Sequence, residues 1–147
     1  MNQSLKPLLI EGSIFKDDRG VIEFVNDFSL SSIKRMYFSS NANTEIIRAW
    51  QGHKVESRWF YCLQGVVDIR VVEIDNWDDP SDKLTVHQFI LKSNVQQVLF
   101  VPKGYANGFK SIESNSRLMI FSDFSLNEVP NDQFRFDKSL WTNWNTK

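Results

Sequence analysis

The segment from Ser57 to Ile74, SRWFYCLQGVVDIRVVEI, is the stretch that most directly indicates the fold. Two runs rich in aromatic and β-branched residues flank Gln64-Gly65, which is the pattern of two strands and a tight turn. A two-residue loop predicts a hairpin in which Leu63 faces Val66 and Arg58 lies opposite Val71. Alternation then gives one apolar face, which we expect to be the interior: Phe60, Cys62, Val67, Ile69 and Val71.

Arg58 ends this apolar face, and a buried guanidinium group needs an anionic partner. Two interpretations stay open: Arg58 pairs with an internal carboxylate, or it binds a phosphate of a ligand. The opposite face carries Trp59, Tyr61, Asp68 and Arg70, and it is too aromatic to lie fully in solvent. It is a candidate subunit interface, unless Tyr61/Asp68 and Trp59/Arg70 form solvated cross-strand pairs.

Similar short segments recur along the chain, and no window keeps a helical apolar period over ten or more residues. They predict strands over residues 21–25, 33–38, 45–50, 57–63, 66–74, 84–91, 97–101, 108–112 and 118–121. The helical candidates are single turns near residues 28–32 and after Asp137. Because neither repeats nor linkers occur, the pattern predicts one all-β domain, a sandwich or barrel, over residues 1–147.

The composition excludes several classes of function. The 147 residues include 17 basic and 18 acidic side chains, which leaves no excess charge to attract nucleic acid or anionic lipid. The longest apolar runs are strand-sized, residues 1–12 lack a signal-peptide pattern and Cys62 is the single cysteine, so we expect a cytosolic protein without a membrane partner. Aromatic residues make up 14% of the chain, which favours strands and the walls of small-molecule pockets.

Only two histidines are present, so a histidine-based mechanism has few candidates. His53 ends a predicted strand beside Gly52, where side chains commonly point into a mouth, and it is our candidate base. The alternative is a surface-loop histidine. His87 alternates within residues 84–91 and is interpreted as an ordinary strand residue. A nucleophilic mechanism is disfavoured, because no Gly-x-Ser-x-Gly motif occurs and Cys62 lies on the apolar face.

Two segments resemble the paired motifs of the cupin family. Residues 51–65 have the spacing of the first motif, and Val101-Pro102-Lys103-Gly104-Tyr105-Ala106-Asn107-Gly108-Phe109 resembles the second. Where a metal-binding cupin has two His, a Glu and a third His, this chain has Gln51, His53, Arg58 and Asn107. One imidazole beside a fixed cation is a poor ligand set for a divalent metal. The resemblance implies a double-stranded β-helix, or jelly roll, without a metal or other cofactor.

Within the cupins, the chain is similar to the dTDP-4-dehydrorhamnose 3,5-epimerases and the related dTDP-sugar 3,4-ketoisomerases. The similarity begins at Asp17-Asp18-Arg19-Gly20, continues through residues 48–53 and 102–109, and ends with Ser122-Asp123-Phe124 and Arg135-Phe136-Asp137. It implies that Arg19, Arg48 and Arg58 bind the nucleotide diphosphate, which suits forked guanidinium groups.

Several positions depart from these families. The segment Gln51-Gly52-His53-Lys54 looks most like the His-x-His-Lys of the ketoisomerases with its first His replaced. Phe124 stands where the epimerases have a tyrosine acid, and Asn107 replaces a further pocket histidine. The standard epimerase dyad therefore cannot operate in this chain. We place Asn107, Phe124 and Tyr61 with the arginines as expected substrate contacts.

His53 would then abstract the proton beside the 4-keto group of the sugar. Gln51 with Tyr105 or Tyr61 would stabilise the enolate. Arg48 and Gln51 have opposite parity on a regular strand, so a β-bulge is needed to bring both to one pocket.

Three functions stay open. The first is a nucleotide-sugar epimerase or ketoisomerase that acts on a dTDP-4-keto-6-deoxyhexose in carbohydrate biosynthesis. The second is a catalytically silent cupin that binds a nucleotide sugar or a saccharide, and the third is a structural or partner-binding jelly roll. The first is favoured because the arginines and His53 occur together. We also expect a homodimer, from the aromatic face described above and from the families that the chain resembles.

Overall fold

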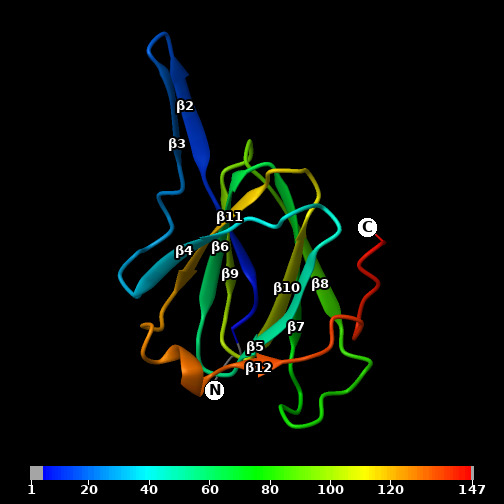
Figure 1. Ribbon diagram of the computed structural model, residues 1–147. Helices are drawn as coiled ribbons and strands as arrows, with labels where there is room; N and C mark the ends of the chain where they lie inside the picture. Colours follow the sequence, from blue (N-terminus) through cyan, green and yellow to red (C-terminus); the bar gives the residue numbers. More distant parts are fainter. Residues whose placement is uncertain (1–4, 147) are drawn as a thin grey trace.

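The computed structural model describes residues 5–146, and two five-stranded antiparallel sheets build most of it (Figure 1). The first sheet has the order β1-β9-β6-β11-β4, and the second has the order β12-β5-β10-β7-β8. A separate hairpin of β2 and β3 projects away from the two sheets (Figure 1). Residues 1–4 and 147, which the single-domain prediction includes, lie outside the described part.

The strands match the predicted segments closely. The first sheet contains β1 (Leu8–Glu11), β9 (Gln97–Val101), β6 (Arg58–Gln64), β11 (Arg117–Ser122) and β4 (Arg35–Ser39). The second contains β12 (Phe134–Arg135), β5 (Ile47–His53), β10 (Tyr105–Ser111), β7 (Val66–Glu73) and β8 (Val86–Lys92), and the hairpin contains β2 (Ser13–Asp17) and β3 (Gly20–Phe24). Each predicted strand is present, whereas β1, β2 and β12 were not predicted. Within residues 5–146, no helix is long and apolar enough to cross a membrane.

The apolar side chains predicted for the interior lie between the two sheets. Phe60 and Cys62 on β6 face Val67, Ile69 and Val71 on β7, and each of the five is at most 2% exposed. Burial of such a side chain contributes about 1.5–3 kcal/mol to stability. Burial also raises the pKa of the Cys62 thiol to about 11, so this cysteine stays protonated and is not a nucleophile.

The predicted hairpin between these two strands is wrong. β6 pairs with β9 and β11, whereas β7 pairs with β10 and β8 in the other sheet. Gly65 has a φ of +79° and makes the turn that carries the chain from one sheet to the other. Leu63 therefore does not pair with Val66, nor Arg58 with Val71. A glycine turn between two alternating strands has the same sequence pattern whether the strands pair or face each other.

The outer face of the first sheet is covered by the chain itself. Trp59 packs against Phe100 on the neighbouring strand and against Phe28, with ring centroids 5.1 and 6.4 Å apart. The Tyr61 hydroxyl donates a hydrogen bond to the Gln96 side chain. The predicted cross-strand pairs Tyr61/Asp68 and Trp59/Arg70 do not form, because their members lie on different sheets.

The outer face of the second sheet is also covered. Asp68 and Arg70 on β7 are buried under the segment that follows β12. A second apolar cluster lies on this side, and it contains most of the tryptophans: Trp50, Trp77, Trp141 and Trp144. Four of the five tryptophans therefore belong to this outer layer. The face proposed as a subunit interface is largely occupied within one chain.

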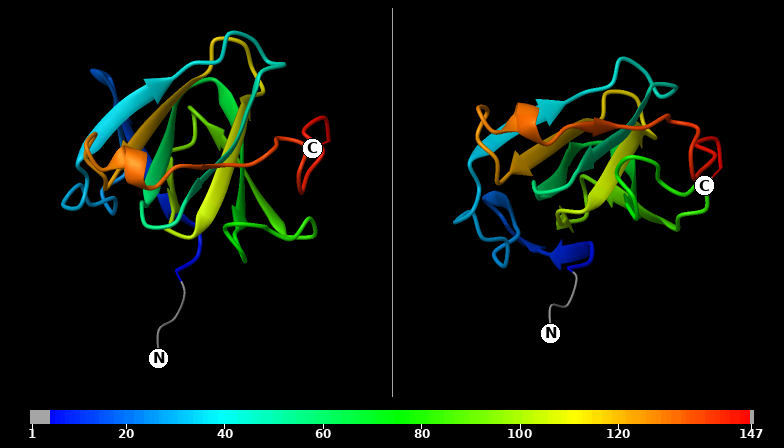
Figure 2. Two further views of the ribbon diagram at one scale, coloured as in Figure 1. Left: turned by 60° about the horizontal axis from the view of Figure 1, so that its bottom comes forward. Right: turned by 90° about the horizontal axis from the view of Figure 1, so that it is seen from below.

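The chain after β11 crosses one end of the sheets (Figure 2). It forms a short 3-10 helix, η1 (Val129–Asn131), and then pairs as β12 with β5, so that Phe134 lies opposite Gly52 and Arg135 opposite Gln51. The segments predicted as single helical turns, near residues 28–32 and after Asp137, contain hydrogen-bonded turns. This crossing brings residues 129–135 beside the end of β5.

Candidate active site

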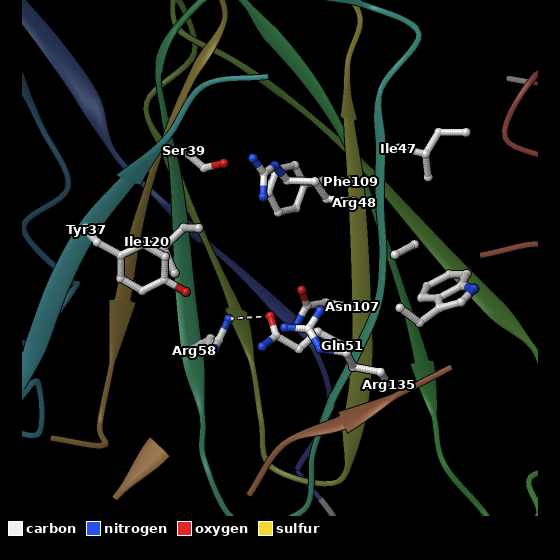
Figure 3. Close-up of a pocket in the computed structure, with 12 residues that line it drawn as sticks. Tyr37, Ser39, Ile47, Arg48, Gln51, Arg58, Asn107, Phe109, Ile120 and Arg135 are labelled. Carbon is white, nitrogen blue, oxygen red and sulfur yellow. Dashed lines mark hydrogen bonds between the residues drawn. The ribbon is translucent and has the colours of Figure 1, made fainter. Parts of the chain in front are cut away.

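A cavity of about 320 Å³ lies between the two sheets, and polar side chains from both line it (Figure 3). Tyr37 on β4 and Arg58 on β6 come from the first sheet. The second sheet contributes polar residues from β5, β10 and β12: Arg48, Gln51, Asn107 and Arg135. The topology thus assembles the cavity wall from segments that are far apart in the sequence.

A β-bulge brings Arg48 and Gln51 to the same cavity. On β10, Asn107 lies opposite Gln51 and Phe109 lies opposite Arg48, so β5 has one more residue than β10 between these pairs. Gly108 faces the bulge, and a Cβ atom there would lie 2.5 Å from the Ala49 Cβ. The predicted bulge is confirmed, although it lies before Gly52 rather than at it.

Three guanidinium groups converge on the cavity, and no carboxylate of residues 5–146 lines it. Arg48 Nε donates to Asn41 Oδ1 at 3.0 Å, and Arg58 Nη1 donates to Gln51 Oε1 at 3.4 Å. Arg135 makes no side-chain hydrogen bond or ion pair with any residue from 5 to 146. Arg48 and Arg135 form no ion pair with any residue from 5 to 146, and this uncompensated positive charge makes the cavity suitable for an anionic ligand.

A buried carboxylate, Glu56, lies beside the cavity and holds several donors together. Its Oε2 is 2.8 Å from His53 Nδ1 and 3.3 Å from Arg58 Nη2. Its Oε1 is 3.5 Å from Arg35 Nη2 and accepts a hydrogen bond from the Ser122 hydroxyl. Burial alone would raise the pKa of Glu56, but the hydrogen bond from His53 and the charge of Arg58 outweigh it and lower that pKa to about 2. Glu56 is therefore a permanent anion at neutral pH.

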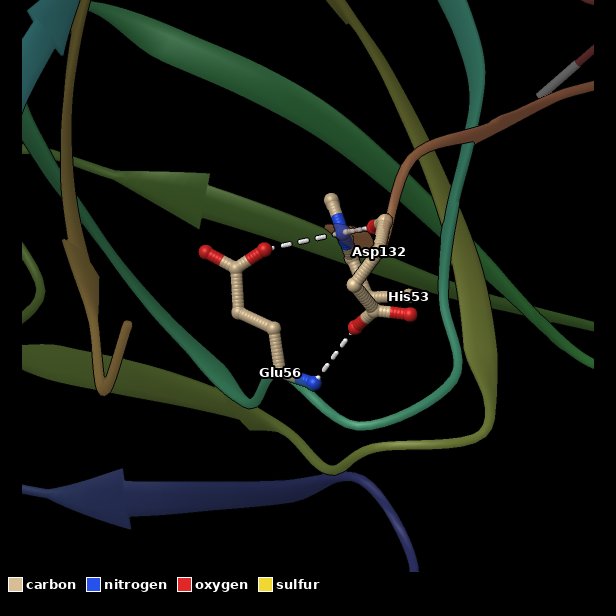
Figure 4. A group of neighbouring side chains, drawn as sticks. All are labelled: His53, Glu56 and Asp132. Carbon is tan, nitrogen blue, oxygen red and sulfur yellow. Dashed lines mark hydrogen bonds and ion pairs between the residues drawn. The ribbon is translucent and has the colours of Figure 1, made fainter. Parts of the chain in front are cut away.

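Asp132 fixes the loop that carries Glu56 (Figure 4). Its carboxylate accepts hydrogen bonds from the backbone N–H groups of Lys54, Val55 and Glu56, at 2.7–2.8 Å. Its backbone carbonyl oxygen lies 3.0 Å from His53 Nδ1. Because an ionised carboxylate and a carbonyl can only accept, Nδ1 must carry the proton and donate it. The other ring nitrogen, Nε2, has no hydrogen-bond partner among residues 5–146.

His53, Glu56 and Asp132 also offer three donor atoms within 4.8 Å of one another, which is a spacing that metal sites use. Both carboxylates are already engaged, however, and the guanidinium groups of Arg58 and Arg35 lie at that of Glu56. The arrangement suits an ion-pair network better than a divalent cation, which needs free deprotonated donors. A metal-free site stays our prediction.

The cavity brings together four of the residues predicted for the site, namely Arg48, Gln51, Arg58 and Asn107. The first of the two interpretations of Arg58 is correct, because Arg58 pairs with the internal carboxylate of Glu56. Arg58 also lines the cavity. His53 is buried behind Arg58 and is not a surface-loop residue. His87 lies exposed on β8, as an ordinary strand residue.

The remaining predicted residues lie elsewhere. Tyr105 is buried in the apolar core, and Tyr61 lies on the outer side of β6. Phe124 follows β11 and is half-buried without lining the cavity. Arg19 occupies the turn of the projecting hairpin, where it pairs with Asp17 and its side chain is 82% exposed. None of these four is brought to the cavity within one chain.

Sequence reasoning did not assign a site role to Tyr37, Glu56, Asp132 or Arg135. A usable signal existed for Glu56, because it precedes Arg58 by two residues and so shares its face on an extended chain. Because a buried Arg58 requires an anionic partner, a search for that partner on the same face would have identified Glu56. Asp132 and Arg135 reach the site only through the crossing segment, which the local sequence pattern does not reveal.

Comparison with known proteins relates the whole arrangement to one family. The chain matches the family model described as "FdtA: WxcM-like, C-terminal" over residues 5–139. The search of curated proteins gives no match. A solved dTDP-4-dehydrorhamnose 3,5-epimerase from Bacillus anthracis, with TDP and PPi bound, is 22% identical with a TM-score of 0.75, over 96% of this chain and 86% of that chain.

Two further solved structures are similar in the same way. A mutant of the 3,4-ketoisomerase QdtA from Thermoanaerobacterium thermosaccharolyticum, in complex with TDP-4-keto-6-deoxyglucose, is 18% identical with a TM-score of 0.69, over 91% of this chain and 90% of that chain. The epimerase RmlC from Legionella pneumophila, in complex with dTDP-4-keto-L-rhamnose, is 18% identical with a TM-score of 0.73, over 94% and 76%. These similarities confirm the predicted all-β cupin, or jelly-roll, fold and the predicted resemblance.

Proposed function

The chain belongs to the FdtA: WxcM-like, C-terminal family, and from this premise we propose that it is a nucleotide-sugar isomerase, an epimerase or ketoisomerase of a dTDP-4-keto-6-deoxyhexose. The cavity carries the proposal, because Arg48, Arg58 and Arg135 surround one space that no carboxylate in the described part of the chain lines. Guanidinium groups bind the paired oxygens of phosphates, so a nucleoside diphosphate fits this charge. Proteins of the same fold were solved with TDP or a TDP-4-keto sugar bound, which supports the same ligand class.

In this proposal, His53 is the base. Its Nδ1–H is held by Glu56 and Asp132, which leaves Nε2 to accept the proton from the carbon beside the 4-keto group. The electron pair of the broken C–H bond passes to the ketone oxygen, and the side-chain amides of Gln51 and Asn107 donate hydrogen bonds to the resulting enolate. These amides line the cavity and replace the tyrosines in that role, since neither Tyr61 nor Tyr105 lines it.

A catalytically silent binding protein is the second candidate. His53 is 2% exposed and does not line the cavity, so substrate reaches Nε2 only if neighbouring side chains move. Gln51 and Phe124 also stand at positions where the related enzymes have catalytic groups. These observations favour binding without turnover, and the experiment below separates the two functions.

Incubation with TDP-4-keto-6-deoxyglucose in heavy water tests the proposal. Enolisation exchanges a carbon-bound proton, so the isomerase incorporates deuterium at a ring carbon, which mass spectrometry or NMR detects. Binding measured by calorimetry without deuterium incorporation would support the silent binding protein instead. Absence of both would reject nucleotide-sugar function altogether.

His53→Asn should reduce the exchange rate by roughly 10²–10⁴-fold, which is the usual contribution of a general base. Binding should stay close to that of the unmodified chain, because asparagine is polar but cannot take a carbon-bound proton. His87→Asn is the matched control, since His87 is the other histidine and lies exposed on β8. Full exchange activity in His53→Asn would exclude His53 as the base.

We also propose a homodimer, now on the basis of the hairpin of β2 and β3 and not of the aromatic sheet face. The hairpin of β2 and β3 exposes at least half of each of four apolar side chains: Ile14, Phe15, Val21 and Ile22. A second copy of the chain would cover them. The hairpin projects away from the two sheets (Figure 1), and Arg19 lies in its turn and does not line the cavity of its own chain, so we assign its ligand contact to the cavity of the second copy. Light scattering checks this, and a strict monomer at high concentration would contradict it.

A further inference from the structure

One oxygen atom, Glu56 Oε2, is shared by two groups with different tasks. It accepts from His53 Nδ1 at 2.8 Å and from Arg58 Nη2 at 3.3 Å. His53 is the proposed base, whereas Arg58 lines the cavity and is proposed to bind the anionic ligand. The Glu56 carboxylate therefore interacts with both the proposed base and the arginine proposed to bind the ligand.

Sharing an acceptor makes the two bonds compete. While Arg58 lies at Oε2, its positive charge offsets the carboxylate and weakens the attraction that a protonated His53 ring would feel. If Arg58 turns toward an anion in the cavity, the carboxylate is left with His53 as the partner of Oε2. Charge-assisted hydrogen bonds to ionised groups are the stronger kind, so the His53 bond gains from this exchange of partners.

Two buried nitrogen atoms of the cluster that lack hydrogen-bond partners fit such an exchange. Arg58 Nε and His53 Nε2 are buried and have no hydrogen-bond partner among the described residues. Buried polar atoms are normally satisfied, and unsatisfied ones need an explanation. Arg58 is held by two long hydrogen bonds, of 3.3 Å to Glu56 and 3.4 Å to Gln51, and its guanidinium carbon lies 5.9 Å from the centre of the Tyr37 ring. A phosphate in the cavity would offer it a second anionic partner in exchange for Glu56.

We propose that Glu56 couples ligand binding to the base: an anion that engages Arg58 in the cavity transfers the Glu56 carboxylate to His53 and so prepares His53 to accept a proton. Glu56 is then a positioning residue that makes His53 an effective base only when the diphosphate is present. The proposal rests on the proposed function, because it assigns His53 and Arg58 the roles given there.

The remaining charged groups around His53 are not part of the exchange. The Asp132 carboxylate is held by backbone N–H groups of the Glu56 loop, and the backbone carbonyl of Asp132 is the group of this residue that accepts from the ring. Arg35 contacts the other oxygen of Glu56, as does the Ser122 hydroxyl, and Tyr105 pairs with His53 through the backbone of β10. The change at Oε2 should therefore reach His53 without compensation from these groups.

Inorganic pyrophosphate is the probe, and the NMR signals of the His53 ring are the readout. As pyrophosphate saturates the unmodified chain, the His53 Nδ1 proton should move downfield, because its hydrogen bond to Glu56 strengthens. The ring signals of His87 should stay in place, which provides an internal control. Equal shifts of both histidines would indicate a general ionic effect and would overturn the proposal, as would saturation without any His53 shift.

Two variants sharpen the test. Arg58→Gln should show the downfield Nδ1 signal without pyrophosphate and should not respond further, because the competing cation is gone. Arg48 lines the same cavity without touching Glu56. The Arg48→Ala variant should therefore bind pyrophosphate more weakly and yet show the same His53 Nδ1 proton shift at saturation. An Arg58→Gln signal at the unmodified position would overturn the coupling.

These outcomes separate the coupling from the proposed function. If pyrophosphate does not bind, the assigned ligand class fails, and the Arg58→Gln spectrum alone still decides the coupling. If the His53 signal responds as expected while deuterium exchange is absent, the coupling stands and the isomerase function fails.

Discussion

Two buried carboxylate–arginine pairs in this molecule have the same sequence spacing and different surroundings. Asp68 and Arg70 lie on the outer face of the second sheet, 2.9 Å apart, with every Arg70 nitrogen donating a hydrogen bond. Besides Asp68, the acceptors are the Thr142 hydroxyl and the backbone carbonyls of Asn143 and Thr146. This pair is complete within the chain.

The pair of Glu56 and Arg58 lies beside the cavity and is incomplete. Arg58 Nε, Arg35 Nε and His53 Nε2 are buried without hydrogen-bond partners among residues 5–146. A buried charge is costly unless it is paired and fully hydrogen-bonded, so these nitrogen atoms without partners do not stabilise the fold. The comparison indicates that the complete pair serves the fold, and it agrees with our proposal that the incomplete pair binds a ligand.

The largest effect should come from breaking the complete pair. Arg70→Met leaves the Asp68 carboxylate buried without its cation, and it should lower the free energy of unfolding by about 3–5 kcal/mol. Urea denaturation measures this loss. Replacing both residues, as in Arg70→Met with Asp68→Leu, should recover part of it. Pyrophosphate affinity of the folded variant should not change, and a change would show that this pair also serves the ligand.

The next effect concerns pH and the incomplete pair. The pKa of Glu56 is lowered from 4.5 to about 2, so its contribution to stability is complete above about pH 4.5 and is lost as pH falls toward 2. The difference corresponds to about 3 kcal/mol. Unfolding measured between pH 5 and pH 2.5 should therefore change less in Glu56→Gln than in the unmodified chain.

Glu128 provides the control for this measurement. Hydrogen bonds from Ser125 and Lys34 also lower its pKa to about 2, but it lies at the surface. Salt should screen the contribution of Glu128 and leave that of the buried Glu56 nearly unchanged. Equal salt sensitivity of the Glu56→Gln and Glu128→Gln differences would contradict the burial of Glu56 as the cause.

The smallest effect should come from Arg135, a cavity arginine without any protein partner among the described residues. Arg135→Ala should weaken pyrophosphate binding by about 1.5–3 kcal/mol, a factor of roughly ten to a hundred, because a charge-assisted hydrogen bond to phosphate is lost. The free energy of unfolding should stay the same. Calorimetry and urea denaturation check the two quantities, and lost stability with unchanged affinity would make Arg135 a structural residue.

The same contrast shows how far sequence reasoning reaches. The apolar alternation of β6 and β7 predicted their inner faces, because burial acts on each strand separately. It could not tell that these strands pair with different neighbours, because Gly65 permits either a hairpin or a passage between sheets. The spacing of Arg48, Gln51, Arg58 and Asn107 along the cupin motifs predicted residues that do share one cavity.

Partners supplied by distant segments escaped prediction. Glu56 stands in the short loop Lys54-Val55-Glu56-Ser57, a pattern typical of solvated residues, and its burial depends on contacts with other strands and with the crossing segment. The same crossing segment provides Asp132 and Arg135. Its pairing with β5 involves only the two-residue strand β12, which is too short to be predicted from sequence periodicity. The covering of Arg70 by residues 142–146 likewise depends on tertiary contacts alone.

The bulge in β5 depends on a residue that does not line the cavity. Ala49 and Trp50 together stand opposite Gly108, so Arg48 and Gln51 face the same side although they are three positions apart. Regular pairing of these residues without the bulge would turn one of the two side chains out of the cavity. Gly108 on the neighbouring strand leaves the room that the bulge needs, because a Cβ atom there would lie 2.5 Å from the Ala49 Cβ. Over descent, Gly108 should therefore be held more strictly than its own lack of a side chain would suggest.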